Sequence, residues 1–526
     1  MLRRIAAVLF FLTVSVAAVA PIRSYDYFWH LAAGRWIADH HALPRVDPLA
    51  VASAKDPWIN GEWLYEVALQ AIQRSVGDPG ISLVNALLVA SIFTAGFWFR
   101  NRLPGGDDGS RQWAPAEIGG SLLIAAVAFA GAFDRLGVRP STAAAMLMVM
   151  ALGCLRSRLT LRWLLIDYAL VSMLWINVHP SAILAPMLAL ATVAIDRKRI
   201  WVALASAAAL LINPFGWRGV AAPIRLTALI RSQEFVNAEW LPSPPAIFPL
   251  FYLTVAIATV WFLVSDRHRE SLWRIAIFVV LAALAVRSVR NQGLYFAALP
   301  LLLPRWNLRE ERLSAVFATC ALIPLIWVFR QDTHQRGIDA TRFPVAAVRT
   351  LAALRLPGNI YNADQFGGLL QWTFYPARRA LTDGRNELFR EFIAEDARAR
   401  GDSRAWRALL DRYTVALAVD EYQRERIEVM DVASGERRAL PASLVRYRRR
   451  DWALLAFDDA AMIFARRSAF PPALLAGREY RYLVPDDPAI GYTSSQILEA
   501  ARSEMVRARR EIGPSAVLAA MEQGAR

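Results

Sequence analysis

Two residues that could exchange protons, Asp26 and His30, lie four positions apart in the stretch SYDYFWHLAAGRW. This stretch follows the apolar run IAAVLFFLTVSVAAVA almost directly. Residues four apart on a helix share a face, and a carboxylate beside an imidazole suits general acid–base catalysis or forms half of a metal site. In the structural alternative, Asp26 caps the helix and His30 is a hydrogen-bonded residue at a membrane surface.

Two more acids of interest follow in the same polar segment: Asp47 in the turn LPRVDP and Glu62 in GEW. The segment contains no Asp-Asp, Asp-Glu or Asp-X-Asp pair. It therefore lacks the acidic pair that would support a bound divalent metal, and we predict no metal ligand set. A metal site that includes Asp26 and His30 remains the open alternative.

These residues belong to a chain whose composition is that of a polytopic membrane protein. Of its 526 residues, 56% are hydrophobic, and the mean hydropathy is +0.30. Soluble domains rarely reach this apolar fraction. We expect the first run to be an uncleaved anchor, because cleavage after AVA would leave Pro21 at the new terminus. Eleven spans are predicted, at about 4–22, 79–99, 117–133, 140–155, 161–176, 180–195, 200–213, 246–265, 272–286, 291–304 and 313–329.

The distribution of basic residues orients these spans. With a cytoplasmic N-terminus, every inner segment carries two or three bases, whereas the longer outer segments hold most of the polar and aromatic motifs. The inner bases are Arg3 and Arg4; Arg100, Arg102 and Arg111; Arg156, Arg158 and Arg162; Arg197, Lys198 and Arg199; Arg267, Arg269 and Arg274; and Arg305, Arg309 and Arg312. The net charge of +15 is thus scattered between spans, which argues against nucleic-acid binding. Cys154 and Cys320 lie inside spans, so no disulfide framework or thiolate metal site is expected.

The predicted architecture has two parts. Residues 1–330 form an α-helical transmembrane domain, whose first outer loop, 23–78, carries two amphipathic helices, FWHLAAGRWIADH and GEWLYEVALQAIQRSV, the second capped by Asn60. Residues 331–526 form a C-terminal extracytoplasmic α/β domain, in which helix-like stretches (VAAVRTLAAL, ELFREFIAEDARAR, SRAWRALLDRY) alternate with strand-like ones. The strand-like stretches are NIYN, RALTD, VALAVD, WALLAF and AMIFARR.

The motifs of most of the chain resemble a family of bacterial polytopic membrane proteins. The resemblance rests on DYFWHLAAGRWIADHHALPRVDPLAVASAKDPWINGEWLYEVAL, WINVHPS, NPFGW, AEWLPS, FPVAAV, NIYNADQFGG, LTDGR and WALLAFDDAAMIFAR. These proteins are in turn similar to the GT-C glycosyltransferases, which include protein O-mannosyltransferases and the aminoarabinose transferases of lipid A. The resemblance implies a GT-C-like fold and transfer of a sugar from a polyprenyl-phosphate carrier to an envelope glycan, lipid or protein, on the outer face of the inner membrane.

The same resemblance implies roles for particular residues. GT-C enzymes carry an acid in the first outer loop just past the first span, and Asp26 holds that position, with Asp47 and Glu62 as the other candidate catalytic acids. A leaving phosphate needs positive charge, and arginine can grip two of its oxygens. Substrate-side candidates are His30, Arg139, His179, Arg218, Arg287 and Arg290. Arg287 and Arg290, three apart in RSVRN, are the strongest pair; headgroup snorkelling is their alternative.

The remaining motifs favour structural roles. NPFGW predicts a helix stop and turn, and the glycines of DQFGGLLQW predict close packing between a helix and a strand. Asp383 and Arg385 in LTDGR predict a turn at a strand end, with contact to the acceptor as the alternative. The best overall prediction is a membrane glycosyltransferase without a certain cofactor. A non-catalytic scaffold of envelope polysaccharide assembly and a transporter or flippase stay open.

Overall fold

The computed structural model describes residues 2–53, 57–102, 115–157, 159–231, 238–265, 269–304, 311–331, 335–423, 426–430, 435–488, 490, 492 and 494–525. The chain forms two compact units. The first comprises Met1–Ser24 and Ile59–Gly337, and the second comprises Tyr25–Trp58 and Ile338–Arg526. The domain boundary predicted from the sequence lies near residue 330. The structure instead places most of the first outer loop with the C-terminal residues.

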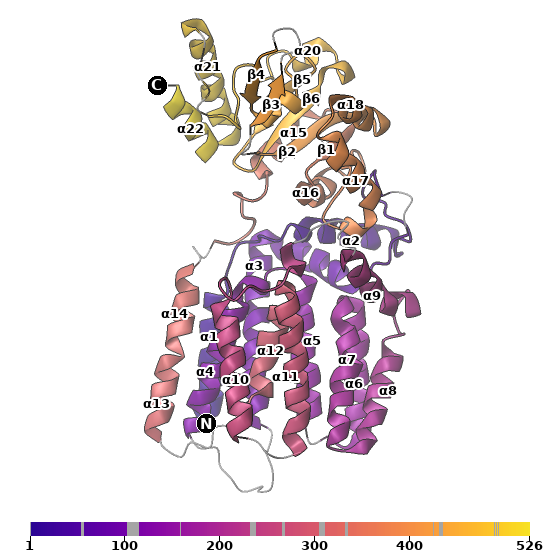
Figure 1. Cartoon of the computed structure of the whole chain (residues 1–526), viewed down its shortest axis with the longest axis vertical. Coiled ribbons are helices and arrows are strands. Elements are labelled where there is room, and N and C mark those ends of the chain that lie inside the picture. Colours follow the sequence, from indigo (N-terminus) through magenta and orange to yellow (C-terminus); the bar gives the residue numbers. More distant parts are fainter. Residues whose placement is uncertain are drawn as a thin grey trace. The chain divides into compact units, whose positions relative to one another are not determined.

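The first unit is a bundle of apolar helices (Figure 1). Each predicted span contains helical residues, and Pro140 begins one helix at the position that proline favours. Ile247 and other large apolar residues stay exposed on this unit, as a bilayer-facing surface requires. Its helices are α1 (Leu2–Ala17), α3 (Trp63–Arg102), α4 (Pro115–Ala132), α5 (Pro140–Arg156), α6 (Leu161–Val178), α7 (Leu184–Ala191), α8 (Ile200–Ala209), α9 (Trp217–Arg231), α10 (Pro249–Ser265), α11 (Arg269–Arg287), α12 (Gln292–Leu302), α13 (Glu311–Cys320) and α14 (Leu322–Gln331).

Three helices among the described residues are long and apolar enough to cross a membrane on their own: Trp63–Arg100, Ile118–Arg135 and Leu161–Val178. Further apolar helices are shorter, among them Pro140–Arg156 and Pro249–Val264. The structure thus shows a helical membrane fold, and the count of eleven crossings remains a prediction. Within α3, Gly77 (φ 66°) interrupts the helical backbone, so the predicted amphipathic helix and the following span are two segments joined at a kink.

Arginines of the predicted inner segments meet at one end of this bundle. The Arg156 guanidinium donates to the carbonyl oxygen of Leu301 at 2.7 Å, and Arg199 donates to that of Leu155 at 2.9 Å. Arg100 is buried and donates to carbonyl groups at the end of α12. These contacts satisfy carbonyls that have no partner within their helices. Arg111, Arg158, Arg267, Arg305 and Arg309 lie outside the described residues.

Predicted outer segments likewise contact one another. Trp63 donates to Asn177 and Arg139 donates to Ser24, each at 2.9 Å. The Ser288 hydroxyl donates to the backbone carbonyl oxygen of Glu239, also at 2.9 Å. Because inner segments contact inner segments and outer contact outer, the alternation of spans agrees with the packing. Which end faces the cytoplasm remains a prediction.

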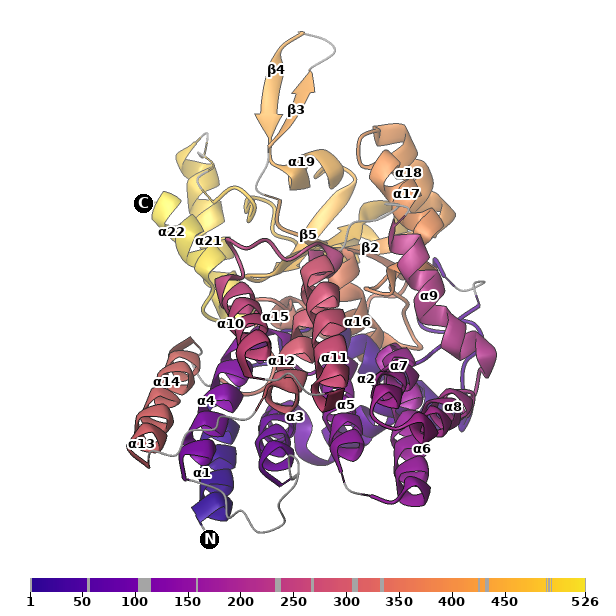
Figure 2. The same cartoon turned by 60° about the horizontal axis from the view of Figure 1, so that its bottom comes forward.

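The second unit contains a four-stranded mixed sheet of order β1-β2-β6-β5. Figure 2 shows the β3–β4 hairpin projecting from this unit. Strands β1 and β2 are parallel, and the other neighbours are antiparallel. The predicted helices VAAVRTLAAL and SRAWRALLDRY and four of the five predicted strands are confirmed. The strands are β1 (Asn359–Asn362), β2 (Val415–Glu421), β3 (Ile427–Met430), β4 (Arg437–Leu440), β5 (Trp452–Phe457) and β6 (Ala461–Arg466). The helices are α2 (Asp26–His40), α15 (Val345–Leu354), α16 (Asp364–Phe374), α17 (Arg390–Ala399), α18 (Ser403–Arg412), α19 (Ala442–Arg446), α20 (Pro472–Leu475), α21 (Ser495–Ile512) and α22 (Ala516–Gly524).

Two glycines of α16 explain how the segment 25–58 joins this unit. A Cβ atom on Gly368 would lie 2.7 Å from the backbone nitrogen of Trp29, and one on Gly367 would lie 1.8 Å from the carbonyl oxygen of Thr382. Helix α16 therefore approaches both α2 and the 379–382 segment at backbone distance, which only glycine permits. The close packing predicted from DQFGGLLQW is confirmed. Predicted strand RALTD forms only isolated bridges, one of them from Ala380 to Ala50.

Candidate functional site

Asp26 is the first residue of α2, and its side chain is partly exposed. Tyr25 precedes the helix, so Asp26 is not the capping residue that the structural alternative assumes. Its Oδ1 accepts a hydrogen bond from Trp29 Nε1 at 3.1 Å. Within the described ranges no other hydrogen bond or ion pair involves this carboxylate. The second oxygen can therefore accept a proton or a hydroxyl group.

His30 differs from Asp26 although the two share a helix face. Its residue surface is only 1% exposed, and its ring contacts that of Trp29, with 3.6 Å between the centroids. Asp26 is hydrogen-bonded to Trp29 rather than paired with the imidazole in the contacts that the structure records. The geometry thus gives Asp26 and His30 different surroundings.

Asp47 is held in a buried ionic network. Its Oδ1 accepts the backbone N–H of Leu49 at 3.0 Å, and its Oδ2 accepts the Ser53 hydroxyl and Arg385 Nη2, the latter at 3.1 Å. Its side chain has no exposed surface. Arg385 also forms a bidentate pair with Asp383, with Nε 2.8 Å from Oδ1. Three donors therefore occupy this carboxylate, which leaves it no free surface for a substrate.

The opposite charges of this network keep its side chains ionised although they are buried. Burial alone would raise the pKa of Asp383. The charge of the Arg385 guanidinium and the hydrogen bond donated by the Gln371 side-chain amide instead hold that pKa below its usual range. Burial likewise disfavours the charged guanidinium, yet Asp383 and Asp47 raise the pKa of Arg385 above its ordinary value. The Arg385 guanidinium also lies 4.4 Å from the Trp58 ring centroid and 5.4 Å from that of Trp29. LTDGR is thus built into the contact between α2, the loop around Asp47 and the sheet.

The turn that follows Asp383 passes directly over Asp26. A Cβ atom on Gly384 would lie 3.1 Å from Asp26 Oδ1. Glu387, three residues further on in the 3-10 turn Asn386–Leu388, is exposed at the surface of the unit. Desolvation nonetheless raises the pKa of Glu387, and the charges of Asp383 and Asp26 add to this rise. A second acid therefore lies within electrostatic range of Asp26, although the first loop itself contains no acidic pair.

In the first unit, three loops that are predicted to be outer loops come together around Glu239 of η5 (Ala238–Trp240). Arg139 forms an ion pair with Glu239, and the Arg290 guanidinium lies 4.4 Å from the centroid of the Trp240 ring. Burial would raise the pKa of Glu239, but Arg139 lowers it, with further contributions from Arg290 and Arg135. We call Arg135, Arg139, Arg290 and Glu239 the outer arginine cluster. Its three cations and one anion leave an excess of positive charge.

Arg287 does not take part in this cluster through any hydrogen bond or ion pair among the described residues. It ends α11 and is exposed. Arg290 contacts Trp240, whereas Arg287 has no such contact among the described residues, and their joint role in binding phosphate remains a prediction. Arg218 is exposed as well, at the start of α9.

Glu62 and His179 form a separate pair in the first unit. Glu62 Oε1 lies 3.6 Å from His179 Nε2, with side-chain exposures of 22% and 10%. His179 Nδ1 accepts the backbone N–H of Ser181 at 3.1 Å, which assigns the ring proton to Nε2, the nitrogen facing Glu62. Asn60 accepts the Glu62 backbone N–H at 3.1 Å, whereas α3 begins at Trp63 and its first backbone bond runs from the Glu66 N–H to the Glu62 carbonyl. The Asn60 side chain therefore closes a turn ahead of the helix and is not the predicted cap.

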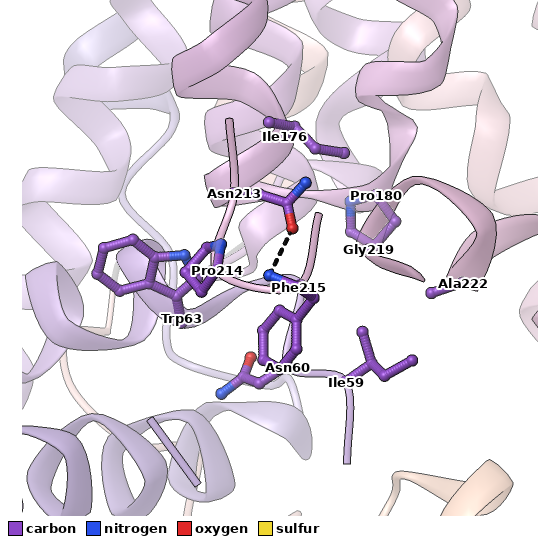
Figure 3. A pocket seen from close by; sticks show the side chains of 11 residues that line it. Ile59, Asn60, Trp63, Ile176, Pro180, Asn213, Pro214, Phe215, Gly219 and Ala222 are labelled. Carbon is purple, nitrogen blue, oxygen red and sulfur yellow. Dashed lines mark hydrogen bonds between the residues drawn. The ribbon is translucent and has the colours of Figure 1, made fainter. Parts of the chain in front are cut away.

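A pocket lies beside this pair, between the start of α3, the η2 turn (Pro180–Ile183) and the beginning of α9 (Figure 3). The space between its lining residues is about 340 Å³, a volume that includes space open to solvent. Asn60, Trp63, Pro180 and Phe215 are among the residues that line it. The lining is mainly apolar and aromatic, so the pocket suits a small apolar group rather than a phosphate.

The NPFGW turn forms one wall of the pocket. Asn213 Oδ1 accepts the Phe215 backbone N–H at 2.9 Å, the bond drawn in Figure 3, and Gly216 adopts φ 54°. The helix stop and turn predicted for this motif are confirmed.

The predicted site residues thus fall into two sets. Asp26, His30 and Asp47 lie in the second unit, and Glu62, Arg139, His179, Arg287 and Arg290 lie in the first. Among the residues that the structure describes, no group of three or more His, Cys, Asp or Glu side chains is placed to hold a metal ion. Sequence reasoning missed Glu239 and Glu387. Glu239 lies in one of the outer polar motifs, AEWLPS, and Glu387 follows LTDGR closely.

Comparison with known proteins connects this architecture to solved structures. The archaeal oligosaccharyltransferase AglB from Archaeoglobus fulgidus, in complex with an inhibitory peptide and a dolichol-phosphate, is 11% identical, with a TM-score of 0.57 over 81% of this chain and 70% of that chain. The same enzyme in the apo form gives a TM-score of 0.55 at 10% identity, over 81% and 70% of the two chains. ArnT from Cupriavidus metallidurans bound to undecaprenyl phosphate is 13% identical, with a TM-score of 0.50 over 89% of this chain and 98% of that chain.

No protein-family model matches the sequence, and no curated protein matches it. At identities of 10–13% the structural likeness shows the fold alone. The chain has a GT-C-like fold, which it shares with AglB and ArnT over most of its length.

Proposed function

We propose that this protein is an integral membrane glycosyltransferase that moves a sugar from a polyprenyl-phosphate carrier to an envelope acceptor, on the outer face of the bacterial inner membrane. The shared fold is the observation that carries the proposal. The AglB structure holds a dolichol-phosphate and the ArnT structure holds undecaprenyl phosphate, two lipids of the same chemical class. A protein with this fold and an open carboxylate just past its first helix is suited to the same class of donor.

In the proposed reaction Asp26 is the general base. The acceptor oxygen attacks the anomeric carbon, and its proton passes to the free oxygen of Asp26. The bond from the anomeric carbon to the phosphate oxygen breaks, and its electron pair stays on the phosphate. Asp26 suits this role because it is partly exposed and bound through one oxygen only. Asp47 is fully covered and has three donors, so we assign it to holding the segment 25–58 in place.

The outer arginine cluster is our candidate for the lipid phosphate. Negative charge grows on the phosphate as the sugar leaves, and preorganised cations stabilise that charge. Ser24 and Glu239 orient the Arg139 guanidinium, and Trp240 supports Arg290 from one side. Arg287 and His179 are weaker candidates, because Arg287 does not join the cluster and His179 faces Glu62. The Glu62–His179 pair is the second candidate for the base.

The test is transfer of labelled sugar from undecaprenyl-phosphate donors by purified full-length protein in liposomes, with a panel of hexoses and pentoses. Asp26→Asn keeps the shape of the side chain and removes its basicity, so the rate should fall about 10²–10⁴-fold. Arg290→Lys keeps the charge and loses the forked donor, so the KM for the donor should rise. Asp39→Asn, on the exposed end of the same helix α2, is the matched control and should keep full activity.

Three other results of this assay would contradict parts of the proposed function. Full activity of Asp26→Asn would contradict its assignment and move the base to Glu62. Wild-type protein that binds undecaprenyl phosphate but transfers no sugar from any donor would contradict the enzyme and support a scaffold. Movement of the intact lipid-linked sugar across the bilayer without transfer would indicate a flippase.

A further inference from the structure

Helix α9, Trp217–Arg231, exposes large apolar side chains along one face. The surfaces of Trp217 and Ile224 are 60% and 63% exposed. Seven residues separate them, which is two helical turns, so they lie on the same side of the helix. On the packed side of the helix, Gly219 and Ala222 line the pocket of Figure 3, and Val220 packs against the core of the bundle. One face of α9 is therefore packed on the protein and the other is not.

Trp217 and Ile224 are each followed directly by an arginine. Arg218 and Arg225 are both exposed. Arg225 lies 5.5 Å from the centroid of the Trp217 ring, which places cation and indole on one face. Within the described part of the chain, neither arginine has a carboxylate partner. The outward face thus combines an aromatic residue, an aliphatic residue and two arginines.

The position of α9 in the first unit matches this composition. The helix begins at the NPFGW turn, directly after α8, and packs on the η2 turn that joins α6 to α7 (Figure 1). It also runs across the direction of these helices rather than along it. The apolar helices α6, α7 and α8 each have one end beside α9, where we expect the hydrocarbon core of the bilayer to end. Tryptophan and arginine are the residues that favour that boundary.

We propose that α9 lies in the membrane interface and binds the phosphates of anionic phospholipids through Arg218 and Arg225, with Trp217 and Ile224 inserted among the acyl chains. Charge complementarity selects this occupant. A protein partner would bury Trp217 and Ile224 but would need acids opposite both arginines, whereas an anionic bilayer supplies both surfaces at once. The two arginines face outward from the pocket, so we assign them to bulk lipid rather than to one donor lipid.

The first experiment measures depth. The full-length protein carrying Ile224→Cys, with Cys154→Ser and Cys320→Ser, is labelled with a fluorophore in nanodiscs. Brominated phospholipids should quench this label strongly, and aqueous iodide should not. A label on Arg404→Cys in the exposed part of α18 is the matched control and should show the reverse. Equal iodide quenching at both positions would overturn the proposal.

The second experiment measures lipid selectivity by native mass spectrometry of phosphatidylglycerol retained on the protein. Arg218→Gln and Arg225→Gln should each lower retention about fivefold, since one basic residue at an anionic surface contributes about 1 kcal/mol. Arg404→Gln with Arg407→Gln, in α18, should leave retention unchanged. Unchanged retention in the α9 variants would overturn the proposal. So would displacement of the retained phosphatidylglycerol by equimolar undecaprenyl phosphate, because the site would then belong to the donor lipid. Both readouts are independent of sugar transfer.

Discussion

Two aspartates of the segment 25–58 have opposite surroundings. Asp47 is fully buried and receives three donors, from Leu49, Ser53 and Arg385. Asp26 is partly exposed and receives one, from Trp29. A buried carboxylate with all its acceptor positions filled stabilises a fold, whereas one with a free oxygen can take a proton. The difference separates residues that hold the site from residues that could act in it.

Among the residues of the buried network around Asp47, Arg385 should have the largest effect on stability. Arg385→Leu would leave Asp47 and Asp383 buried without their cation, and removal of one partner from a buried ion pair costs about 3–5 kcal/mol. The second unit should therefore unfold at markedly lower temperature, as measured by tryptophan fluorescence of the full-length protein. Arg379→Leu, an exposed arginine of the same segment, should change little. Equal melting of Arg385→Leu and wild type would show that the network is not stabilising.

Low pH should also weaken the same network, but it should destabilise the fold less than Arg385→Leu does. The pKa of Asp383 is lower in the folded protein than its ordinary value, because Arg385 and Gln371 outweigh the effect of burial. A group with a depressed folded pKa stabilises the fold above its unfolded pKa, about 3.9 for aspartate, and this contribution is lost as the pH falls through the folded value. Hydrogen exchange of peptides covering 383–389 should thus accelerate below about pH 4. Exchange that accelerates instead between pH 5 and 7 would contradict the assignment.

The sequence predicts the elements of this region well and its connections poorly. Apolar runs and the NPFGW turn depend on neighbours in the chain, and the structure confirms them. The pairing of Asp47 with Arg385 joins residues 338 positions apart, and no local pattern indicates such a contact. The same holds for α2. Its aromatic residues suggest a helix on the bilayer surface, yet its buried face contacts Gly368 of α16.

The candidate site was predictable to a similar extent. Asp26 could be selected from its place after the first apolar run, but its difference from Asp47 could not. The second acid near Asp26 comes from Glu387, and the acid at the centre of the outer arginine cluster comes from Glu239, each in a motif distant from the residues it meets. Motif composition identifies such outer segments as polar. Only the fold shows which of them lie together.

A substitution at Gly384 tests whether the turn over Asp26 positions this carboxylate for sugar transfer. Gly384→Ala would place a methyl group 3.1 Å from Asp26 Oδ1, so the carboxylate must shift by a few tenths of an ångström. Misplacement of about 1 Å costs on the order of 10²-fold, so we expect roughly tenfold lower transfer here. The φ angle of Gly384 lies outside the left-handed region, so folding should not suffer. Gly401→Ala, where the nearest neighbour is 3.8 Å away, is the control, and equal activity of the two variants would contradict the effect.

Trp29 should give the smallest effect and the finest test of the comparison. Trp29→Phe removes the single donor to Asp26 while keeping an aromatic ring against Arg385. Because Asp26 is partly exposed, water can replace the lost donor, and the loss should be about 1 kcal/mol, or about fivefold in kcat. The KM for the lipid donor should not change, since the proposed phosphate residues belong to the first unit. Trp36→Phe on the same helix keeps every hydrogen bond to Asp26 and should leave kcat and KM unchanged. An equal loss in both variants would assign Trp29 to packing alone. A change in KM without one in kcat would place Asp26 in donor binding rather than in proton transfer.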